Sequence, residues 1–423
     1  MAVELIANLI CFGLYFTGTS VSNYPKGTEH TASVIRYMHE RERNNPFYRA
    51  ETTHTQTLND GALNGYNGVS AFTSSANVKT TLFMQALGYG AKNTYNRYAF
   101  EESSPVANLF LGLKYMIDRD DKDKTSTFFA EKNHFGSTTL LENQAYLPLA
   151  FLAEPELAEL NFDSSGNAFH FQNQLFTAAT GLEAGVWQRI PGENLAITAV
   201  DASVSDEDGT GYCKYVSEKK DATVTYSFTA HVNGFACIHL NLPKRNSYYV
   251  SINGVELYKE TISLPQMIAV DDVQIGDVIE VRIVCKADEN STMTVGAAIL
   301  ANDLFWQGYE ILKASTLELT AFDSSYVKGM ITCNRDGLLY ASIPQNGNWE
   351  VKVDGKPADI HLVGDCMIGV MLTPGQHLVE YTYRNTAFSL GWKISLLCAA
   401  VFGMLACRTQ KRIPGKKRGN FER

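Results

Sequence analysis

The chain has 423 residues and a mass of 46.8 kDa, enough for two or three domains. Hydrophobic residues make up 45% of it and the mean hydropathy is −0.14, values that exclude both a polytopic membrane protein and a disordered chain. The formal net charge is −9, although residues 408–423 alone carry +6. An acidic body with a short basic terminus argues against nucleic acid as a partner.

The N-terminus begins with a short apolar segment. Residues 5–16 are apolar, but Glu4 interrupts the run and no Lys or Arg precedes it, so it lacks the charged start of a signal peptide. Three interpretations remain open for residues 1–17: a short membrane anchor, an uncleaved signal, or the end of a membrane helix bundle.

Residues 18–195 show a mixture of helix and strand patterns, which predicts a mixed α/β domain. The segment 47–51 and the segment 114–117 read as strands, and the charged run 118–124 is expected to be a solvated loop. Capping residues and apolar periodicity predict helices over Ser33–Arg43, after Asn77, from Ser104-Pro105 to Gly112, and over Gln172–Thr180 before Gly181.

Beyond residue 195 the pattern changes to the period of two that is typical of strands, and no further helix is expected before the C-terminal segment. Two sets of short strands, each with a hairpin signal (Asn253-Gly254 and Asp354-Gly355), predict a β-sandwich over 196–306 and a second one over 307–385. The boundary is placed near Trp306–Lys313. The chain as a whole is therefore predicted to be α+β.

Residues 387–407 form an uninterrupted apolar segment with a single charge, Lys393. Its length suits a helix that crosses the hydrocarbon layer, with Trp392 and Lys393 at the interface. The basic residues 408–423 predict a cytoplasmic tail by the positive-inside rule, which places the bulk of the chain outside the cytoplasm. We therefore expect a cell-membrane protein whose first partner is the lipid bilayer.

The usual catalytic motifs are absent from the sequence. It contains no GxSxG, HExxH, Walker A or GxGxxG pattern and no cysteine–histidine metal spacing. No catalytic residue, metal ligand or cofactor is expected. One loop, Leu63–Ser75, combines glycines with aromatic, amide and hydroxyl side chains, which suits either a sugar-binding surface or a purely structural loop.

Several stretches resemble the C-terminal half of the bacterial YfhO-like membrane protein family, in the same order along essentially the whole chain. They are FYRAE (47–51), LNGYNGVSAFTSSAN (63–77), ALGYG (86–90), LFLGLKYMI (109–117), AYLPLAFL (145–152), FQNQLFTAATG (171–181), IPQNGNWEVKVDGKPA (343–358) and LTPGQHLVEYTYRN (372–385), followed by the closing membrane helix.

The resemblance implies a role in glycosyl transfer. Full-length relatives are similar to polytopic glycosyltransferases that move a sugar from a polyprenyl-phosphate carrier to a cell-surface polymer such as a teichoic acid. It also implies that the carrier-binding bundle and its catalytic acid are missing from these residues, because the gene is split and a separate polytopic chain is the partner, because the sequence covers half of the enzyme, or because the chain is a remnant. We therefore expect no activity from these residues alone. The alternative is a non-catalytic surface protein that binds carbohydrate or a protein partner through its β-sandwich domains.

If the chain serves a glycosyltransferase, the loop Leu63–Ser75 is the predicted substrate-binding surface. Tyr66 could stack on a sugar, Asn67, Ser74 and Ser75 could hydrogen-bond hydroxyl groups, and Arg49 could pair with a phosphate. The competing hypothesis makes Tyr66 a core residue and Arg49 a partner in an internal ion pair.

Overall fold

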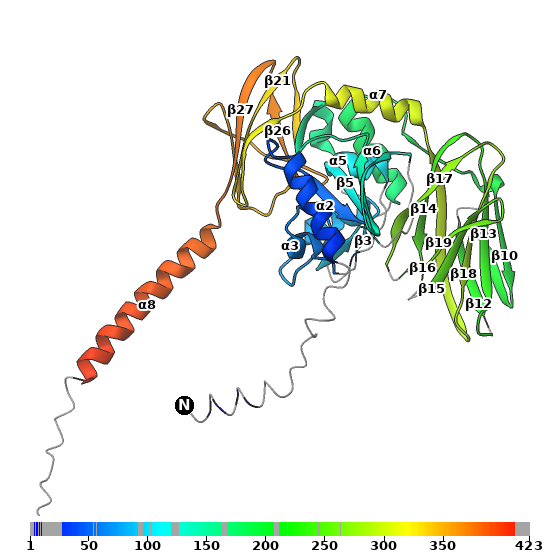
Figure 1. Ribbon diagram of the computed structural model, residues 1–423, viewed down its shortest axis with the longest axis horizontal. Helices are drawn as coiled ribbons and strands as arrows, with labels where there is room; N and C mark the ends of the chain where they lie inside the picture. Colours follow the sequence, from blue (N-terminus) through cyan, green and yellow to red (C-terminus); the bar gives the residue numbers. More distant parts are fainter. Residues whose placement is uncertain are drawn as a thin grey trace, which may run out of the picture.

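The computed structural model describes residues 28–410, apart from residues 54, 56, 92–95, 101–103, 120–126, 162–166, 207–210, 218, 243–245 and 263, together with residues 4, 6, 8 and 10. Most of the predicted N-terminal membrane segment and the tail beyond residue 410 therefore lie outside the described residues. Within them the chain is α+β, with β-rich parts flanking a mixed central part and one long helix projecting away (Figure 1).

The central part contains a four-stranded sheet in the order β1-β5-β7-β6, in which only the β1–β5 pair is parallel. Helix α2 (Thr28–Arg41) lies against this sheet and buries Val34, Ile35 and Met38 in a small core of its own. The strands are β1 (Arg49–Thr52), β5 (Leu113–Arg119), β6 (Phe129–Phe135) and β7 (Thr138–Asn143).

Short helices and a small three-stranded sheet complete the central part. The predicted caps are confirmed: the Asn77 side chain accepts from the Lys79 amide, and Ser104 accepts from the Ala107 amide. The elements are α3 (Asp60–Asn64), β2 (Ala71–Phe72), α4 (Val78–Ala86), β3 (Gly90–Ala91), β4 (Arg97–Ala99), α5 (Pro105–Phe110), η2 (Pro155–Glu159) and α6 (Ala168–Thr180).

Two predictions about this part are wrong. Of the predicted solvated loop 118–124, Asp118 and Arg119 instead end strand β5 and are buried, where Asp118 accepts from the Thr53 hydroxyl and Arg119 faces the Asp60 carboxylate at 3.8 Å; residues 120–124 lie outside the described residues. Helices also do not disappear after residue 195. Helix α7 (Asn302–Lys313) covers the stretch predicted as a boundary, and its Phe305 packs on Phe176 of α6.

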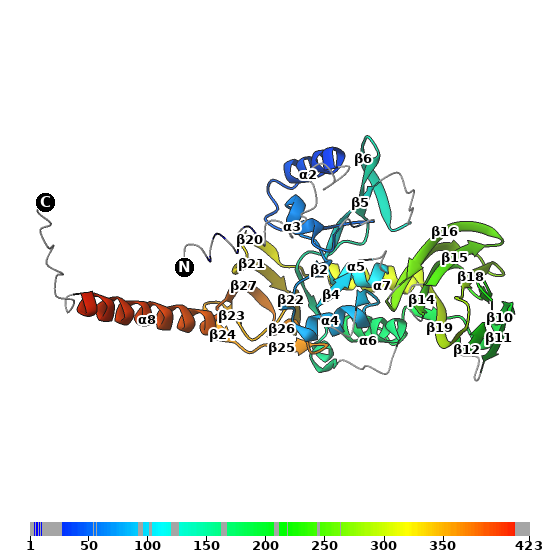
Figure 2. The ribbon, with the colours of Figure 1, turned by 90° about the horizontal axis from the view of Figure 1, so that it is seen from below.

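The first β region consists of two facing sheets around a common core (Figure 2). One sheet has the order β10-β13-β18-β15-β16, and the other β11-β12-β19-β14-β17 with β9 beside β19. The bounds are β9 (Trp187–Arg189), η3 (Gly192–Asn194), β10 (Leu195–Val200), β11 (Ala202–Asp206), β12 (Tyr212–Ser217), β13 (Thr223–Thr229), β14 (Gly234–Asn241), β15 (Asn246–Ile252), β16 (Val255–Ile262), β17 (Gln266–Val273), β18 (Val278–Val284) and β19 (Glu289–Leu300).

The second β region is also built from two sheets, with the orders β20-β21-β27-β23-β24 and β25-β26-β22-β8. Its edge strand β8 (Ala150–Ala153) comes from the mixed part of the sequence and pairs with β22. The other strands are β20 (Glu318–Phe322), β21 (Tyr326–Cys333), β22 (Gly337–Pro344), β23 (Trp349–Val353), β24 (Lys356–Ala358), β25 (His361–Val363), β26 (Met367–Leu372) and β27 (Gly375–Tyr383). The domain boundaries drawn from the sequence stay predictions.

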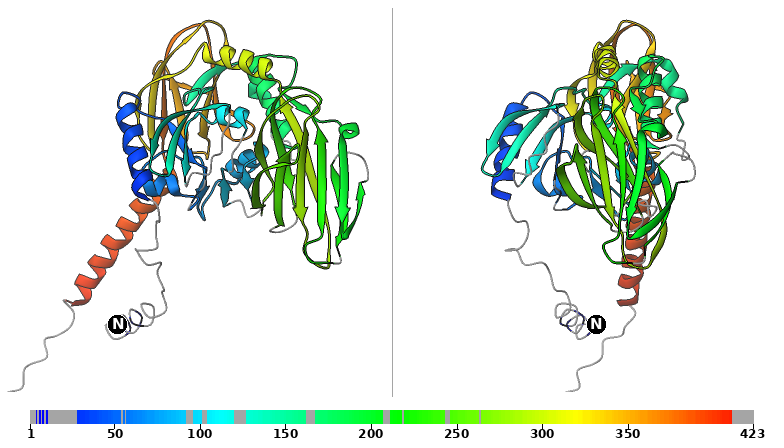
Figure 3. Two further views of the ribbon diagram at one scale, coloured as in Figure 1. Left: turned by 45° about the vertical axis from the view of Figure 1, so that its right-hand side comes forward. Right: turned by 90° about the vertical axis from the view of Figure 1, so that its right-hand side faces the viewer.

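Helix α8 (Thr386–Gln410) follows β27 directly and projects from the body (Figure 3). Residues Thr386–Arg408 have a mean hydropathy of 1.8 and are not covered by the rest of the protein, as the exposures of Phe388 (72%) and Phe402 (74%) illustrate. Apolar side chains left so open on a helix of this length are typical of a membrane span. It is the one such helix among the described residues.

Candidate functional site

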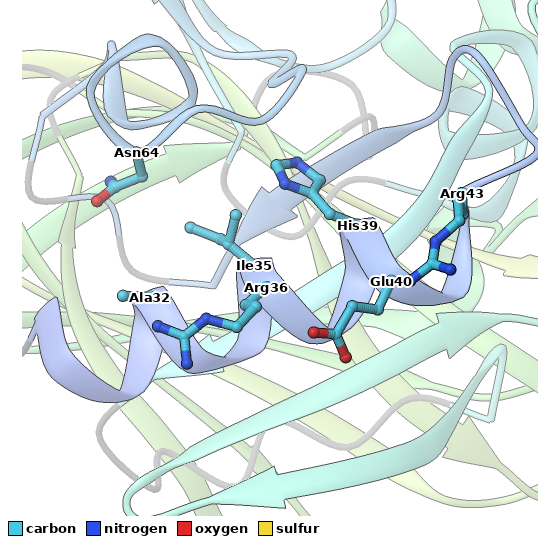
Figure 4. A pocket seen from close by; sticks show the side chains of 7 residues that line it. All are labelled: Ala32, Ile35, Arg36, His39, Glu40, Arg43 and Asn64. Carbon is cyan, nitrogen blue, oxygen red and sulfur yellow. The ribbon is translucent and has the colours of Figure 1, made fainter.

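An open groove runs between α2 and the turn that follows α3. Two adjoining hollows of about 470 and 370 Å³ form it, and both are lined by His39 and Arg43. Figure 4 shows the first hollow, with the side chains of α2 along one wall and Asn64 on the other. The second hollow continues past Arg43 to Tyr48 and Asn67.

The α2 wall is basic. Arg36 and His39 lie on the exposed face of the helix and Arg43 on the turn after it, at the i, i+3, i+7 spacing that keeps side chains on one face. Among the described residues, neither arginine is within 4 Å of a carboxylate. Among the described residues that line the first hollow, Glu40 is the one acidic side chain, so the α2 wall carries more positive than negative charge.

The opposite wall is a tight turn that only certain residues permit. Gly65 adopts φ +81° as it ends α3, and its amide and that of Tyr66 both donate to the Gly61 carbonyl at 2.9 Å. A side chain at Gly61 would meet the Gly68 amide nitrogen at 2.8 Å. Because both positions need glycine, the turn presents the next two side chains, Tyr66 and Asn67, in fixed places.

A buried carboxylate fastens this turn to β1. The Glu51 side chain is 1% exposed, and its oxygens accept from the backbone amides of Val69 at 2.8 Å, Ser70 at 2.7 Å and Thr52 at 3.1 Å. Burial raises the pKa of Glu51 more than these hydrogen bonds lower it. The Asn67 amide adds a bond of 3.1 Å to the Tyr48 carbonyl, so the turn is rigid.

Two tyrosines with buried hydroxyls line the second hollow. The Tyr48 and Tyr66 side chains are 6% and 7% exposed, and neither hydroxyl has a hydrogen-bond partner among the described residues. Burial raises the pKa of Tyr48 to about 12 and also raises that of Tyr66, so both stay protonated and can donate. Both hydroxyl oxygens are shielded from solvent and both rings belong to the small core under α2, so these hydroxyls are not open to a ligand in the hollow.

The carboxylate of Glu42, which lies below the groove, already accepts several hydrogen bonds. Burial alone would raise the pKa of Glu42, but hydrogen bonds from Lys114, Tyr115 and Asn45 outweigh it and lower the pKa. Lys114 donates at 2.6 Å and Tyr115 at 2.5 Å. With its carboxylate held in this way, Glu42 is not a free general base.

The structure places the five predicted binding residues in three different settings. Tyr66 and Asn67 line the groove. Ser74 and Ser75 are exposed on the turn between β2 and α4, outside the groove, where Ser75 bonds to Thr73. Arg49 points into the body and donates to Ser342 and to the Leu111 carbonyl. Their roles in binding stay predictions, and Arg49 is engaged in internal hydrogen bonds.

The sequence analysis missed the cations of the groove. Arg36, His39 and Arg43 belong to the predicted helix Ser33–Arg43, but nothing in the local sequence distinguishes them from an ordinary solvated face. Their i, i+3, i+7 spacing is the signal that could have drawn attention to them, because it places three basic side chains opposite the apolar Val34 and Met38.

Comparison with known proteins gives one family and one curated relative. The family model described as bacterial membrane protein YfhO matches residues 2–395. The uncharacterised protein YfhO of Bacillus subtilis (strain 168) is 20% identical over 402 residues, which cover 88% of this chain and 44% of that protein. The chain thus spans about half the length of this relative.

Solved structures match parts of the chain with low scores. A low-affinity xylan-binding module, CBM86, from Roseburia intestinalis is 16% identical, covers 28% of this chain and 99% of its own, and has a TM-score of 0.22. A family 35 carbohydrate-binding module from Clostridium thermocellum is 14% identical, covers 27% of this chain and 98% of its own, and has a TM-score of 0.20. Scores of this size do not establish a shared fold.

Proposed function

Because this chain belongs to the YfhO family of bacterial membrane proteins, we propose that it is the extracytoplasmic, membrane-anchored half of a glycosyltransferase system. The system transfers sugars from polyprenyl-phosphate carriers to a cell-surface polymer such as a teichoic acid. The half described here holds the acceptor polymer, and the polytopic helix bundle that binds the carrier is the other half of the system.

The single observation that carries this role is the basic groove along α2. Arg36 on α2 and Arg43 on the turn after it flank His39 along the first hollow. Guanidinium groups bind phosphate oxygens well, while a side-chain amide such as that of Asn67 binds sugar or glycerol hydroxyls. This combination suits a polymer that carries several anionic groups between hydroxyl-bearing units.

The anchor supports the same proposal. Helix α8 has the length and composition of a membrane span and follows the second β region without a linker. A lipid-linked sugar is confined to the membrane surface, so a half-enzyme that presents the acceptor must be held there. We propose that the folded body lies outside the cytoplasm, where the cell-surface polymer is, and that the residues after α8 lie inside.

Polymer glycosylation in cells tests the proposal. The chain is deleted and then restored either as the parent, as the double variant Arg36→Gln/Arg43→Gln, or as Lys286→Gln, a control that removes an exposed positive charge from the first β region. We expect deletion to abolish the sugar on the polymer, the double variant to lower it several-fold, and Lys286→Gln to restore it fully. All three proteins should melt at the same temperature, because exposed substitutions rarely change stability by more than about 0.5 kcal/mol.

The result can also contradict the proposal. If deletion leaves polymer glycosylation unchanged, the chain has no part in the transfer, and a non-catalytic surface protein that binds carbohydrate or a partner becomes the better interpretation. If deletion abolishes glycosylation but the double variant restores it fully, the chain serves the transfer through another surface and the groove is not the acceptor site.

A further inference from the structure

We propose that the segment Phe72–Lys79, between β2 and the first turn of α4, is a membrane-contact surface that rests on the lipid headgroups beside the entry point of α8. This inference is independent of the glycosyltransferase proposal and requires only that α8 crosses a membrane. It assigns a lipid bilayer as the partner of a surface whose apolar side chains are left open by the rest of the protein.

The segment exposes two large apolar side chains. Phe72 is 45% exposed and Val78 is 46% exposed, whereas most apolar residues of the central part are buried. Isolated exposed apolar residues are common on protein surfaces. The case for this segment rests on its rigidity, its position and the charges around it.

The backbone on both sides is held in place, so the exposure does not come from a frayed end. The Asn59 side chain donates to the Phe72 carbonyl at 3.0 Å and accepts from the Phe72 amide at 2.9 Å. Asn77 caps α4 by accepting from the Lys79 amide at 3.0 Å. Both apolar side chains are thus presented by fixed backbone, as a surface that meets a partner requires.

A chain of hydrogen bonds connects this segment to the start of α8. The Asn77 side chain donates to the Gln345 carbonyl at 3.0 Å. Gln345 begins the turn that includes Asn348, whose carbonyl accepts from the Arg384 amide at 2.7 Å, and α8 begins two residues later at Thr386. The segment therefore lies beside the point where the chain leaves the body for the membrane.

The figures agree with this connection. In Figure 3 helix α8 leaves the body from its lower side, the blue elements lie between α8 and the green first β region in the left view, and that β region reaches lower still. Figure 2, seen from below, shows β2, β4 and α4 without the β regions in front of them. The segment thus lies on the side of the body from which α8 leaves.

Two cations accompany the apolar side chains. Lys79 is exposed next to Val78 and, among the described residues, has no ion-pair partner. Arg97 lies opposite Phe72 in the β2–β4 pair and is half-buried, with its Nε atom inside the protein. Apolar side chains that dip into a headgroup layer next to cations that meet lipid phosphates are the pattern of interfacial contact.

The test places a tryptophan on the surface and measures its quenching by lipid. The full chain is reconstituted in vesicles of phosphatidylglycerol and phosphatidylcholine that carry a nitroxide at headgroup level in both leaflets. Phe72→Trp and Val78→Trp are compared with Val255→Trp, a control on the β15–β16 hairpin where the native side chain is 67% exposed. The emission of the unsubstituted chain, which holds four tryptophans, is subtracted from each.

We expect the tryptophans at 72 and 78 to lose most of their emission in nitroxide vesicles and the tryptophan at 255 to keep it. Purified vesicles contain no second protein, so quenching there identifies lipid as the contact. If the tryptophans at 72 and 78 are quenched no more than the one at 255, the surface does not touch the bilayer and the proposal fails. Thermal melting of each variant confirms that the emission comes from folded protein.

Discussion

Arg49 and Ser342 are joined by two hydrogen bonds, of 2.6 Å to the Ser342 hydroxyl and 2.8 Å to its carbonyl, although they lie 293 residues apart in sequence. A third bond of 2.6 Å joins Arg49 to the Leu111 carbonyl. One guanidinium therefore connects β1, the end of α5 and β22. The arginine that the sequence suggested as a phosphate partner ties the central part to the second β region.

Arg49→Gln should destabilise the protein strongly. Glutamine cannot reach all three acceptors, and hydrogen bonds to a charged group contribute about 1.5–3 kcal/mol each before the remaining groups are solvated. We expect a loss of roughly 2–4 kcal/mol, seen as a clear drop in Tm. Arg43→Gln, which removes an exposed guanidinium from the groove, serves as the matched control and should leave Tm unchanged. An Arg49→Gln protein that melts like the parent would contradict the structural role.

Gly308→Ala should show that α7 is part of the core. A Cβ at Gly308 would lie 2.2 Å from the Phe176 ring and 3.0 Å from the Thr180 methyl, so α6 and α7 would have to separate. We expect a destabilisation of about 1–3 kcal/mol despite the better helix propensity of alanine. Gln307→Ala, at the exposed neighbouring position, should be neutral or slightly stabilising. Equal melting temperatures for the two variants would mean that α7 is loosely attached.

Glu51→Ala should loosen the turn that forms one wall of the groove. The substitution leaves three backbone amides, those of Thr52, Val69 and Ser70, without their acceptor inside the protein. We expect a loss of about 3 kcal/mol and much faster hydrogen exchange of the Val69 and Ser70 amides. Glu40→Ala, which removes an exposed carboxylate across the groove, should change neither quantity. Unchanged exchange in Glu51→Ala would show that the glycine turn is rigid without the carboxylate.

The contribution of His377 to stability should depend on pH. Its Nδ1 faces the Asp354 carboxylate at 2.8 Å and its Nε2 faces the Thr373 carbonyl at 2.9 Å, an arrangement that favours the imidazolium. The hydrogen bond to Asp354 raises the pKa of His377, and the same bond lowers the pKa of Asp354. The histidine's contribution is therefore complete below its unfolded pKa of about 6.5 and is lost as pH rises through the folded pKa.

Asp354 sets the lower end of the pH range in which the His377–Asp354 pair stabilises the protein. Because its pKa is lowered on folding, its contribution is present above about pH 3.9 and is lost as pH falls through the folded value. The Tm difference between the parent and His377→Gln should thus be largest near pH 5–6 and shrink towards pH 9. Asp354 is 51% exposed, so we expect no more than about 1 kcal/mol. Asp354→Asn should add little in the His377→Gln background, and a difference that is constant from pH 5 to 9 would contradict the ion pair.

The orientation of the chain can be read from thiol labelling of intact cells. A membrane-impermeant maleimide should modify Val255→Cys, at a position whose native side chain is 67% exposed, because we expect the body to lie outside. It should not modify Gly415→Cys in the basic tail until the cells are opened. The reverse pattern would place the body in the cytoplasm and would exclude any contact with a cell-surface polymer.

Local signals allowed the sequence to predict several elements correctly. The cap at Asn77, the Ser104-Pro105 start and the Gly181 end are confirmed because each depends on residues within one turn. The two predicted hairpin turns are also local: Asn253 and Asp354 have φ of 50° and 51°, as these turns require. The apolar segment 387–407 likewise needs no tertiary information to be recognised as a helix.

Features that depend on distant partners were not predictable. Asp118 and Arg119 looked solvated because Thr53 and Asp60, which pair with them, are more than fifty residues away. Helix α7 starts at Ala301 without a side-chain cap and has Gly308 at its centre, so its local pattern is weak. In the groove, Tyr66 and Asn67 were predicted from an unusual loop, but their basic neighbours come from another element and are united with them only by folding.

Strand β8 is synthesised well before the strand with which it pairs, in a chain whose body we propose to cross the membrane. All four of its residues, Ala150–Ala153, are buried, yet Ala153 pairs with Leu338, and the amide of Leu152 donates to the Ser315 carbonyl. At the usual rates of synthesis the apolar strand emerges roughly 10–30 s before those partners exist. During that interval it is an unpaired edge open to aggregation. Folding of this protein during synthesis therefore depends on a holding factor, or on a nascent intermediate that covers the strand.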